Sequence, residues 1–137
     1  MDGAVLKRLR ADAGVQAAAG VYAGKPAIDH NERKSNEKTA FPAAIQTVVA
    51  GDKQYDQDRA IGSRTWRLRW ECMSLDSDDG AVALSDAIIA ALEPADTFAG
   101  VRFGRGFLVL ERSGGNEDIA DLPIFRRIID LNITATY

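Results

Sequence analysis

The strictest alternation of apolar and polar positions lies in residues 64–74. Its apolar members, each separated from the next by one polar residue, are Trp66, Leu68, Trp70 and Cys72. This period of two predicts a strand with one buried and one solvated face. Arg67 and Arg69 fall on the solvated face, so we expect them to meet acidic residues of a neighbouring strand or of another subunit.

Three further segments have the composition of strands: residues 41–51, 101–112 and 125–137. β-branched residues follow Pro42 in the first segment, which we expect to end at Gly51. Gly104 and Gly106 interrupt the second, where a bulge or a close backbone approach would fit. The third alternates between apolar and polar residues up to the last position.

Apolar residues recur at helical spacing in residues 2–13 and 77–94. This spacing predicts two amphipathic helices. We expect the first to end at Gly14, with one further helical turn in the Ala-rich residues that follow. The second should begin at an N-cap, Ser77 or Asp78, and stop at Pro94.

Polar segments predict the connections between these elements. Residues 25–39 contain a charged run with almost no apolar side chain, which predicts a long exposed loop. Residues 52–63 predict a second projecting loop or a hairpin tip, and residues 113–118 predict a turn. The order α-β-β-α-β-β favours an α+β fold: one domain over residues 1–137, with a mainly antiparallel or mixed sheet packed by two principal helices.

The composition supports this picture of one folded domain. The chain has 137 residues, 46% of them apolar, and its 17 basic and 20 acidic residues give a net charge of -3. That balance argues against binding duplex DNA through overall charge. Cys72 cannot form an intrachain disulfide and the first residues lack a leader pattern, so we expect an intracellular protein. Asp86 interrupts the longest apolar stretch, which is too short to cross a bilayer.

The sequence offers little catalytic or metal-binding chemistry. One His and one Cys exclude a zinc site, and the acidic residues before Gly80 are out of register with a calcium loop. No nucleophile motif accompanies His30, and no cofactor-binding fingerprint occurs, so we predict no cofactor. Asp52, Asp56 and Asp58 share one loop, and their use as acid-base groups stays open.

The chain resembles the tail terminator proteins of long-tailed bacteriophages and gene transfer agents, also called tail completion or tail-to-head joining proteins. The likeness spans nearly the whole sequence. It rests on the segments LKRLRADAGVQAA, VYAG, FPAAIQ, RTWRLRWECMS, GAVALSDAIIAALEP and IFRRIIDLNITATY. The resemblance implies no catalysis: such proteins form a hexameric ring that caps the finished tail tube, stops its polymerisation and presents a surface to the head connector.

The resemblance therefore implies a structural virion protein and not an enzyme. Its expected places are the virion tail and, during assembly, the host cytoplasm. Its expected partners are further copies of the chain in a homo-hexamer, the tail tube protein and the head connector or neck protein. The resemblance implies no membrane partner and no specific nucleic acid, although DNA passes through the bore of such a ring. Whether the free chain is a monomer stays open.

Contacts between copies are expected at two charged regions, the loop at residues 52–63 and the solvated face of the strand after it. The candidate interface residues are Asp52, Lys53, Tyr55, Asp58, Arg59, Arg64, Arg67 and Arg69. A head-to-tail ring needs two different complementary surfaces on each copy, and Arg67 and Arg69 opposing acidic loop residues would provide them.

Three other functions stay open. The chain could be another connector, neck or minor tail component of the same kind of particle. It could be a small enzyme that uses Asp52, Asp56 or Asp58. A module that binds single-stranded nucleic acid is disfavoured, because the tryptophans and arginines of residues 64–74 point to opposite faces of the predicted strand.

Overall fold

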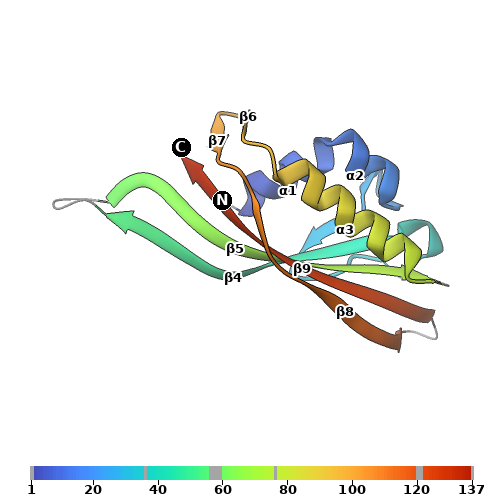
Figure 1. Ribbon diagram of the computed structural model, residues 1–137. Helices are drawn as coiled ribbons and strands as arrows, with labels where there is room; N and C mark the ends of the chain where they lie inside the picture. The colour runs from blue at the N-terminus through green and yellow to red at the C-terminus, as the bar shows by residue number, and fades with distance from the viewer. Residues whose placement is uncertain (1, 36, 56–59, 76, 120–121, 137) are drawn as a thin grey trace.

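A seven-stranded mixed β-sheet carries the helices α1, α2 and α3 on one of its faces (Figure 1). The computed structural model describes residues 2–35, 37–55, 60–75, 77–119 and 122–136, and the side chains of all of these except residues 2, 52–55, 60–63, 117–119 and 122. The arrangement of the sheet and the helices confirms the α+β fold. It also confirms a mixed sheet, since one of its strand pairs is parallel.

The strands follow an order that leaves two outer edges. In spatial order the strands are β3 (Ile28–His30), β4 (Ala43–Tyr55), β5 (Ala60–Leu75), β9 (Leu122–Thr136), β7 (Val101–Phe103) and β6 (Asp96–Phe98). The strand β8 (Phe107–Ile119) pairs with the same edge of β9 as β7 does. β3 is parallel to β4, and the other pairs are antiparallel. β3 pairs only with residues 44–46 of β4, so the rest of β4 forms one outer edge of the sheet among the described residues. β8 forms the outer edge at the opposite side of the sheet.

The first helical region contains a break that the sequence analysis placed wrongly. α1 (Asp2–Ala11) ends before Asp12, whose carboxylate accepts a hydrogen bond of 3.0 Å from the Val15 amide and caps α2 (Ala13–Ala18). Asp12 therefore separates the two helices, since a side-chain acceptor satisfies an amide that the start of a helix leaves free. Gly14, predicted to end the first helix, lies inside the second one. The further helical turn is confirmed.

α3 (Asp79–Leu92) packs across the middle of the sheet. Its buried side chains recur every three or four residues, at Ala81, Leu84, Ser85, Ile88 and Leu92. Asp78 occupies the N-cap position, as predicted, but its side chain makes no capping hydrogen bond. The helix ends two residues before Pro94. This C-terminal end is fixed by Arg8 of α1, whose guanidinium group donates to the carbonyl oxygens of Ala91 and Pro94 at 2.9 and 2.8 Å.

The core lies between the helices and one face of the sheet. Leu68, Trp70 and Cys72 of β5 are fully buried there, as the alternation in residues 64–74 predicts, and Trp66 is half-buried. The indole Nε1 of Trp70 donates a hydrogen bond of 3.0 Å to the Oε1 of Gln46, which is also fully buried. A buried indole N–H needs such an acceptor, so Gln46 fixes the orientation of this ring within the core.

Residues 25–39, predicted to be one exposed loop, are partly structured. The segment contains β2 (Lys25–Pro26), which forms a small hairpin with β1 (Val21–Tyr22), as well as β3 and a 3₁₀ helix, η1 (Lys38–Ala40). Ile28 of β3 is fully buried in the core. The prediction failed because three residues of β3 are too few to show a period of two among charged neighbours.

The long strands extend beyond their predicted ends. β4 continues past Gly51 to Tyr55 and pairs with the first part of β5, so the described arms of residues 52–63, predicted to be a projecting loop or a hairpin tip, belong to an antiparallel strand pair. β8 likewise runs through residues 113–118, which were predicted to be a turn, and its register shifts between Ser113 and Gly115, whose φ is 79°. In both cases pairing with a long neighbour outweighs the local preference of polar and glycine residues for turns.

The predicted strand at residues 101–112 is two strands, β7 and β8. Gly104 and Gly106 interrupt it, and the predicted close approach is confirmed at Gly106, whose amide donates to the carbonyl oxygens of Leu92 and Glu93 at 3.0 and 3.1 Å. A Cβ at this position would overlap with the Leu92 carbonyl oxygen. The end of α3 therefore rests directly on the start of β8.

Candidate subunit interface

Arg67 and Arg69 of β5 meet one acidic residue of the neighbouring strand β9. The Nε of Arg67 donates to the Asp130 carboxylate at 3.0 Å, and the Nε and Nη2 of Arg69 donate to it at 2.7 and 3.0 Å. Asp130 has no solvent exposure, whereas the arginines are 39% and 35% exposed. This confirms the expected partner on a neighbouring strand.

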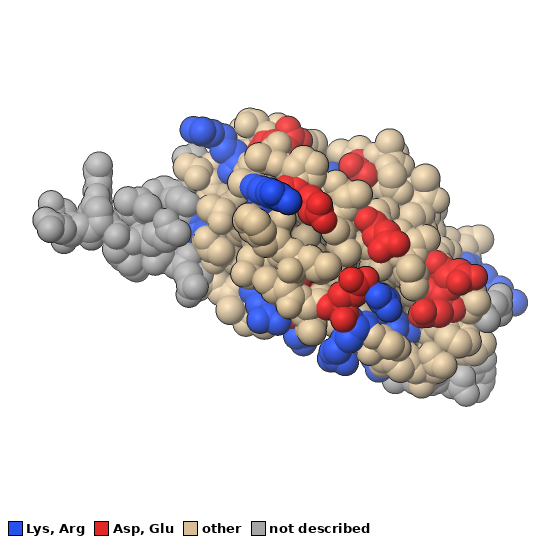
Figure 2. All heavy atoms as spheres, viewed as in Figure 1, with Lys and Arg blue, Asp and Glu red and all other residues tan. Residues whose placement is uncertain are grey.

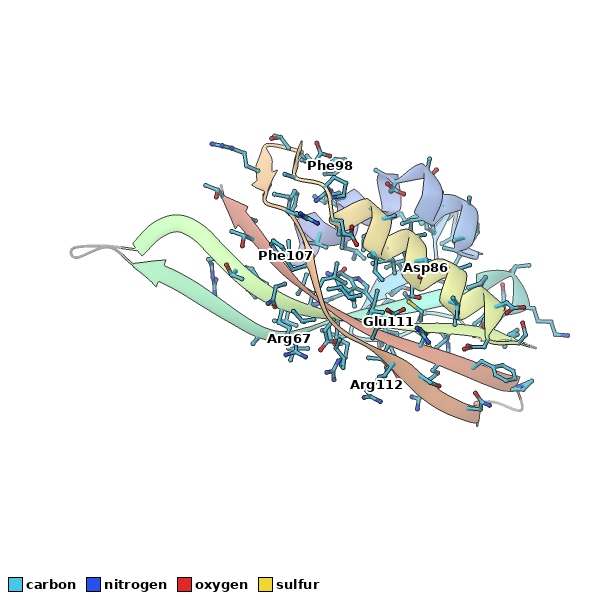
Figure 3. The ribbon with its side chains drawn as sticks, in the orientation of Figure 1. Arg67, Asp86, Phe98, Phe107, Glu111 and Arg112 are labelled. Carbon is cyan, nitrogen blue, oxygen red and sulfur yellow. The ribbon has the colours of Figure 1, made fainter. Side chains whose placement is uncertain are left out.

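The two arginines hold Asp130 in its charged form. Burial alone would raise the pKa of this carboxyl, but the hydrogen bonds and charges of Arg69 and Arg67 outweigh burial and lower the pKa. The same hydrogen bonds raise the pKa of Arg69. Two arginines share the single negative charge of Asp130, so this group carries a net positive charge. It lies on the outer face of the sheet, which is turned away from the helices. Arg112 of β8 lies on the same side of the sheet (Figure 3).

The other candidate interface residues are only partly placed. Asp52, Lys53 and Tyr55 belong to β4, but their side chains lie outside the described residues, as do Asp58 and Arg59 altogether. The guanidinium group of Arg64 stacks on the Trp66 ring, 4.3 Å from its centre. The role of these residues at an interface stays a prediction.

Large apolar side chains are exposed on both outer edges of the sheet. Phe107, Leu108 and Val109 begin β8, and Phe107 is the most exposed of them at 57%. Val48 and Val49 lie on the stretch of β4 that β3 leaves uncovered. Exposed apolar residues on strand edges are unusual in a soluble monomer, because such edges pair with other chains. The sequence analysis identified both strands but not their place at the edges of the sheet, since the sequence of one strand does not show which other strands pair with it.

Charge is distributed unevenly over the helix layer. Asp86 of α3 lies on the side of β8, near Glu111 (Figure 3), and Glu93 directly follows the last residue of α3. Figure 2 shows acidic and basic residues along this side of the molecule. Arg127 is one of the basic residues, donating a hydrogen bond of 2.6 Å to Glu111. That hydrogen bond raises the pKa of the Arg127 guanidinium, and the charges of Asp78 and Asp86 add to the effect. The side of the molecule along β8 therefore carries charges of both signs, since Arg112 lies on β8 and the Arg105 guanidinium lies 5.5 Å from the centre of the Phe107 ring.

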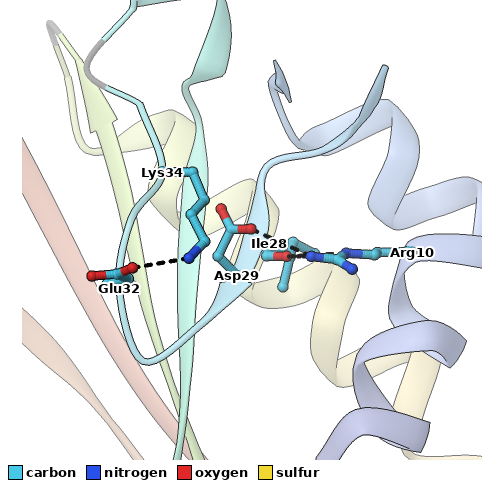
Figure 4. Close-up of polar contacts among 5 residues, drawn as sticks. All are labelled: Arg10, Ile28, Asp29, Glu32 and Lys34. Atoms are coloured by element: carbon cyan, nitrogen blue, oxygen red, sulfur yellow. Dashed lines mark hydrogen bonds and ion pairs between the residues drawn. The ribbon is translucent and has the colours of Figure 1, made fainter. Parts of the chain in front are cut away.

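Basic residues line two adjoining clefts at the opposite side, beside β3 and α1. One cleft of about 370 Å³ is lined by Arg10, Tyr22, Ala23, Lys25, Pro26, Asp29 and Lys34. A neighbouring cleft of about 480 Å³ adds Lys7 of α1. Arg10 donates to the Ile28 carbonyl oxygen at 2.8 Å and to Asp29 at 3.3 Å, and Lys34 pairs with Glu32 (Figure 4). Lys7 and Lys25 have no acidic partner among the described residues.

The groups that could perform chemistry are few in the described part of the chain. Within residues 2–35, 37–55, 60–75, 77–119 and 122–136, no three His, Cys, Asp or Glu side chains gather closely enough to hold a metal ion. Cys72 is fully buried, and burial raises the pKa of its thiol. His30 lies exposed at the end of β3, with its Nδ1 3.4 Å from the Nδ2 of Asn31. No described helix is long and apolar enough to span a membrane.

Comparison with known proteins relates this fold to a viral-type particle. No family model and no curated protein sequence matches the chain. A chain from the virion of a native gene transfer agent particle shares the fold with a TM-score of 0.65 and 16% sequence identity, over 100% of this chain and 95% of that one. A second solved protein aligns with a TM-score of 0.60 and 14% identity, over 99% of this chain and 93% of that one. At these identities the likeness shows the shared fold.

Proposed function

We propose that this chain is a structural virion protein that caps the tail tube as a ring, stops its polymerisation and joins the tail to the head. The observation that carries the proposal is its full-length correspondence in fold with a chain of a gene transfer agent virion. A shared architecture over the whole length supports a shared kind of role, although fold alone does not define function.

The surface of the described residues supports a role in assembly. Both outer edges of the sheet expose apolar side chains, and the helix layer carries acidic residues at one side and basic residues at the other. Such a surface suits binding to other protein chains, because apolar contact supplies affinity and charge supplies orientation. In this proposal the chain acts by its shape and by its contacts, without catalysing a reaction.

The proposed assembly is a homo-hexamer that binds the tail tube protein on one side and the head connector or neck protein on the other. In the ring, the candidate residues of the β4–β5 arms and Arg64, Arg67 and Arg69 would contact neighbouring copies or these partners. Because Asp130 already neutralises part of the charge of Arg67 and Arg69, their remaining donors are the ones available to a partner. The proposed location is the virion tail, reached from the host cytoplasm during assembly.

The proposal can be tested by adding the purified chain to the particle's tail tube protein while that protein polymerises. We expect tube elongation to stop at a length that falls as the amount of added chain rises, with the chain at one end of each tube in electron micrographs. Unchanged tube lengths and no end-bound chain would contradict capping. Attachment of heads without any effect on tube length would instead identify a neck or connector component.

A further inference from the structure

The outer face of the sheet presents a row of side chains that crosses four strands. The helices lie on the other face (Figure 1), and residues directly opposite one another on antiparallel strands share a face. Arg69 of β5 lies opposite Thr47 of β4 and opposite Asp130 of β9. Asp130 in turn lies opposite Leu110 of β8. All four side chains therefore belong to the outer face.

Arginines from three strands gather on this face. Arg67 lies opposite Asn132 of β9, in the next row. Arg112 of β8 lies opposite Ile128, which precedes Asp130 by two residues on β9, and Arg126 follows two residues further along the same strand. Figure 3 shows Arg67 and Arg112 on the same side of the sheet, and Figure 2 shows basic residues along the lower margin of the molecule. We call Arg67, Arg69, Arg112 and Arg126 the outer arginines.

The carboxylates of the outer face are already neutralised by these arginines. Asp130 is fully buried beneath two of them, and Glu71 accepts a hydrogen bond of 2.7 Å from the Nη1 of Arg126. These two are the acids that β4, β5, β8 and β9 place on the outer face among their described side chains, because Glu111 lies opposite Ile129 on the helix side. Four arginines thus face two carboxylates, so the outer face is positive although the whole chain has a net charge of -3.

The outer face also offers guanidinium donors that the described part of the chain does not use. Arg67 and Arg69 contact Asp130 through Nε and Nη2, which leaves the Nη1 of each without a partner there. Arg112 is exposed and has no hydrogen bond or ion pair among the described residues. β5 and β8 flank β9, so these three groups are spread over about 10 Å at the usual strand spacing. Such a spread suits an extended polyanion better than a single small anion.

The side chains between the arginines favour a nucleic-acid backbone over an acidic protein. The described residues of β5 and β9 expose no large apolar side chain; those that are exposed in the sheet lie on the edge strands. The outer face of the two central strands carries small polar groups instead, among them Asn132 and the hydroxyls of Thr65 and Thr134, which are 2.9 Å apart. A protein interface takes its affinity from an apolar or aromatic centre, whereas phosphate contacts use arginine, threonine and asparagine without one.

We propose that the outer face binds the phosphate backbone of double-stranded DNA without reading its sequence. Arg67, Arg69 and Arg112 donate to the phosphate oxygens, for which the planar guanidinium group is well suited. The Asp130 carboxylate holds two of the three groups in place, so less side-chain freedom is lost on binding. The described outer face of β5 and β9 has no aromatic ring on which unpaired bases could stack, which favours a duplex over a single strand. The proposal goes beyond the tail-capping function and does not rest on it.

The test measures binding of a fluorescently labelled DNA duplex of mixed sequence to the full chain by anisotropy, over a series of salt concentrations. We expect the logarithm of the affinity to fall linearly with the logarithm of the salt concentration, and equally for duplexes of different sequence. Arg112→Glu should weaken binding by about tenfold or more and lower this slope by about one, because a charged contact to phosphate is lost. Since Arg112 has no partner in the described fold, thermal unfolding of the variant should match that of the wild-type chain.

The matched control is Lys7→Glu, which makes the same change of charge at an exposed position of α1, on the other face of the sheet. Its affinity for the duplex should stay within about twofold of the wild-type value, because salt screens a charge so far from the contact. An equal loss in both variants would overturn the proposal, since it would reflect overall charge alone.

Two further probes decide the kind of partner. Polyglutamate should compete poorly with the duplex, and a single-stranded oligonucleotide of the same length should bind more weakly than the duplex. The proposal is overturned if the wild-type chain does not bind the duplex at low salt, if the single strand binds more tightly, or if polyglutamate binds as well as DNA, which would identify an acidic protein as the partner. Tube length tests the tail-capping function independently, so the two proposals can fail separately.

Discussion

The guanidinium group of Arg69 donates two hydrogen bonds, of 2.7 and 3.0 Å, to the carboxylate of Asp130 on the adjacent strand. Arg67, two residues earlier on β5, donates a third to the same carboxylate. Asp130 lies on the face of the sheet away from the helices and still has no solvent exposure, because these side chains cover it. One buried carboxylate thus links the two longest strands of the sheet at their centre.

Asp130→Ala should lower the free energy of unfolding by about 2–3 kcal/mol, since it leaves two guanidinium groups without their acceptor and opens a buried site. The partial exposure of both arginines limits the loss, because water replaces some of the lost hydrogen bonds. Urea unfolding at neutral pH measures the difference. The control Asp86→Ala, at an exposed position of α3, should change stability by less than about 0.5 kcal/mol. Equal effects of the two substitutions would contradict the role assigned to Asp130.

The lowered pKa of Asp130 also predicts a dependence of stability on pH. In the unfolded chain this carboxyl titrates near its ordinary value of about 3.9, and in the folded chain it titrates below that value. The stabilisation is therefore complete above the unfolded pKa and is lost as the pH falls through the lower, folded pKa. The stability difference between wild type and Asp130→Asn should shrink as the pH falls below about 4. A difference that stays constant down to pH 2 would show that Asp130 does not titrate in this way.

The sequence alone was sufficient for the elements whose pattern is local. The alternation around Trp70 predicted β5 and its buried face, and the apolar spacing around Leu84 predicted α3. It failed where the decisive interaction is distant in sequence. β4 continues past Gly51 because β5 offers a long partner. The error at Gly14 has a local cause, because the Asp12 carboxylate caps a second helix that begins at Ala13.

The candidate interface was only partly predictable for the same reason. The alternation put Arg67 and Arg69 on one face and suggested an acidic neighbour, but the identity of Asp130 depends on the register between β5 and β9. The exposed residues Phe107 and Val49 could not be recognised at all, because an apolar strand at the centre of a sheet has the same sequence pattern as one at its edge. Pairing order is a property of the whole chain.

The contact between the end of α3 and the start of β8 makes Gly106 a sensitive position. Gly106→Ala places a Cβ against the Leu92 carbonyl oxygen, so the backbone must shift, and we expect a loss of stability of about 1–3 kcal/mol. Gly104→Ala is the matched control two residues earlier, where the nearest atom, the Thr134 Cβ, would lie at an ordinary 3.6 Å. Thermal unfolding of both variants measures the effect. A Gly106→Ala chain as stable as Gly104→Ala would mean that α3 does not rest on β8 as described.

Cys72 should be unreactive in the folded chain. Its thiol is fully buried, and burial raises its pKa, so the reactive thiolate is scarce at pH 8. A coloured thiol reagent should therefore react slowly with the native protein and completely in strong denaturant. Rapid reaction of the native chain would place Cys72 at an accessible surface and contradict the packing of β5.

The central claim is that the chain completes a virion tail by its contacts alone. It is tested most directly by deleting the gene that encodes this chain and measuring tail lengths and head attachment of the particles by electron microscopy. We predict tails of widely varying length that carry no heads, with normal particles restored by supplying the wild-type chain. Tails of the normal length joined to heads in the deletion strain would contradict the account.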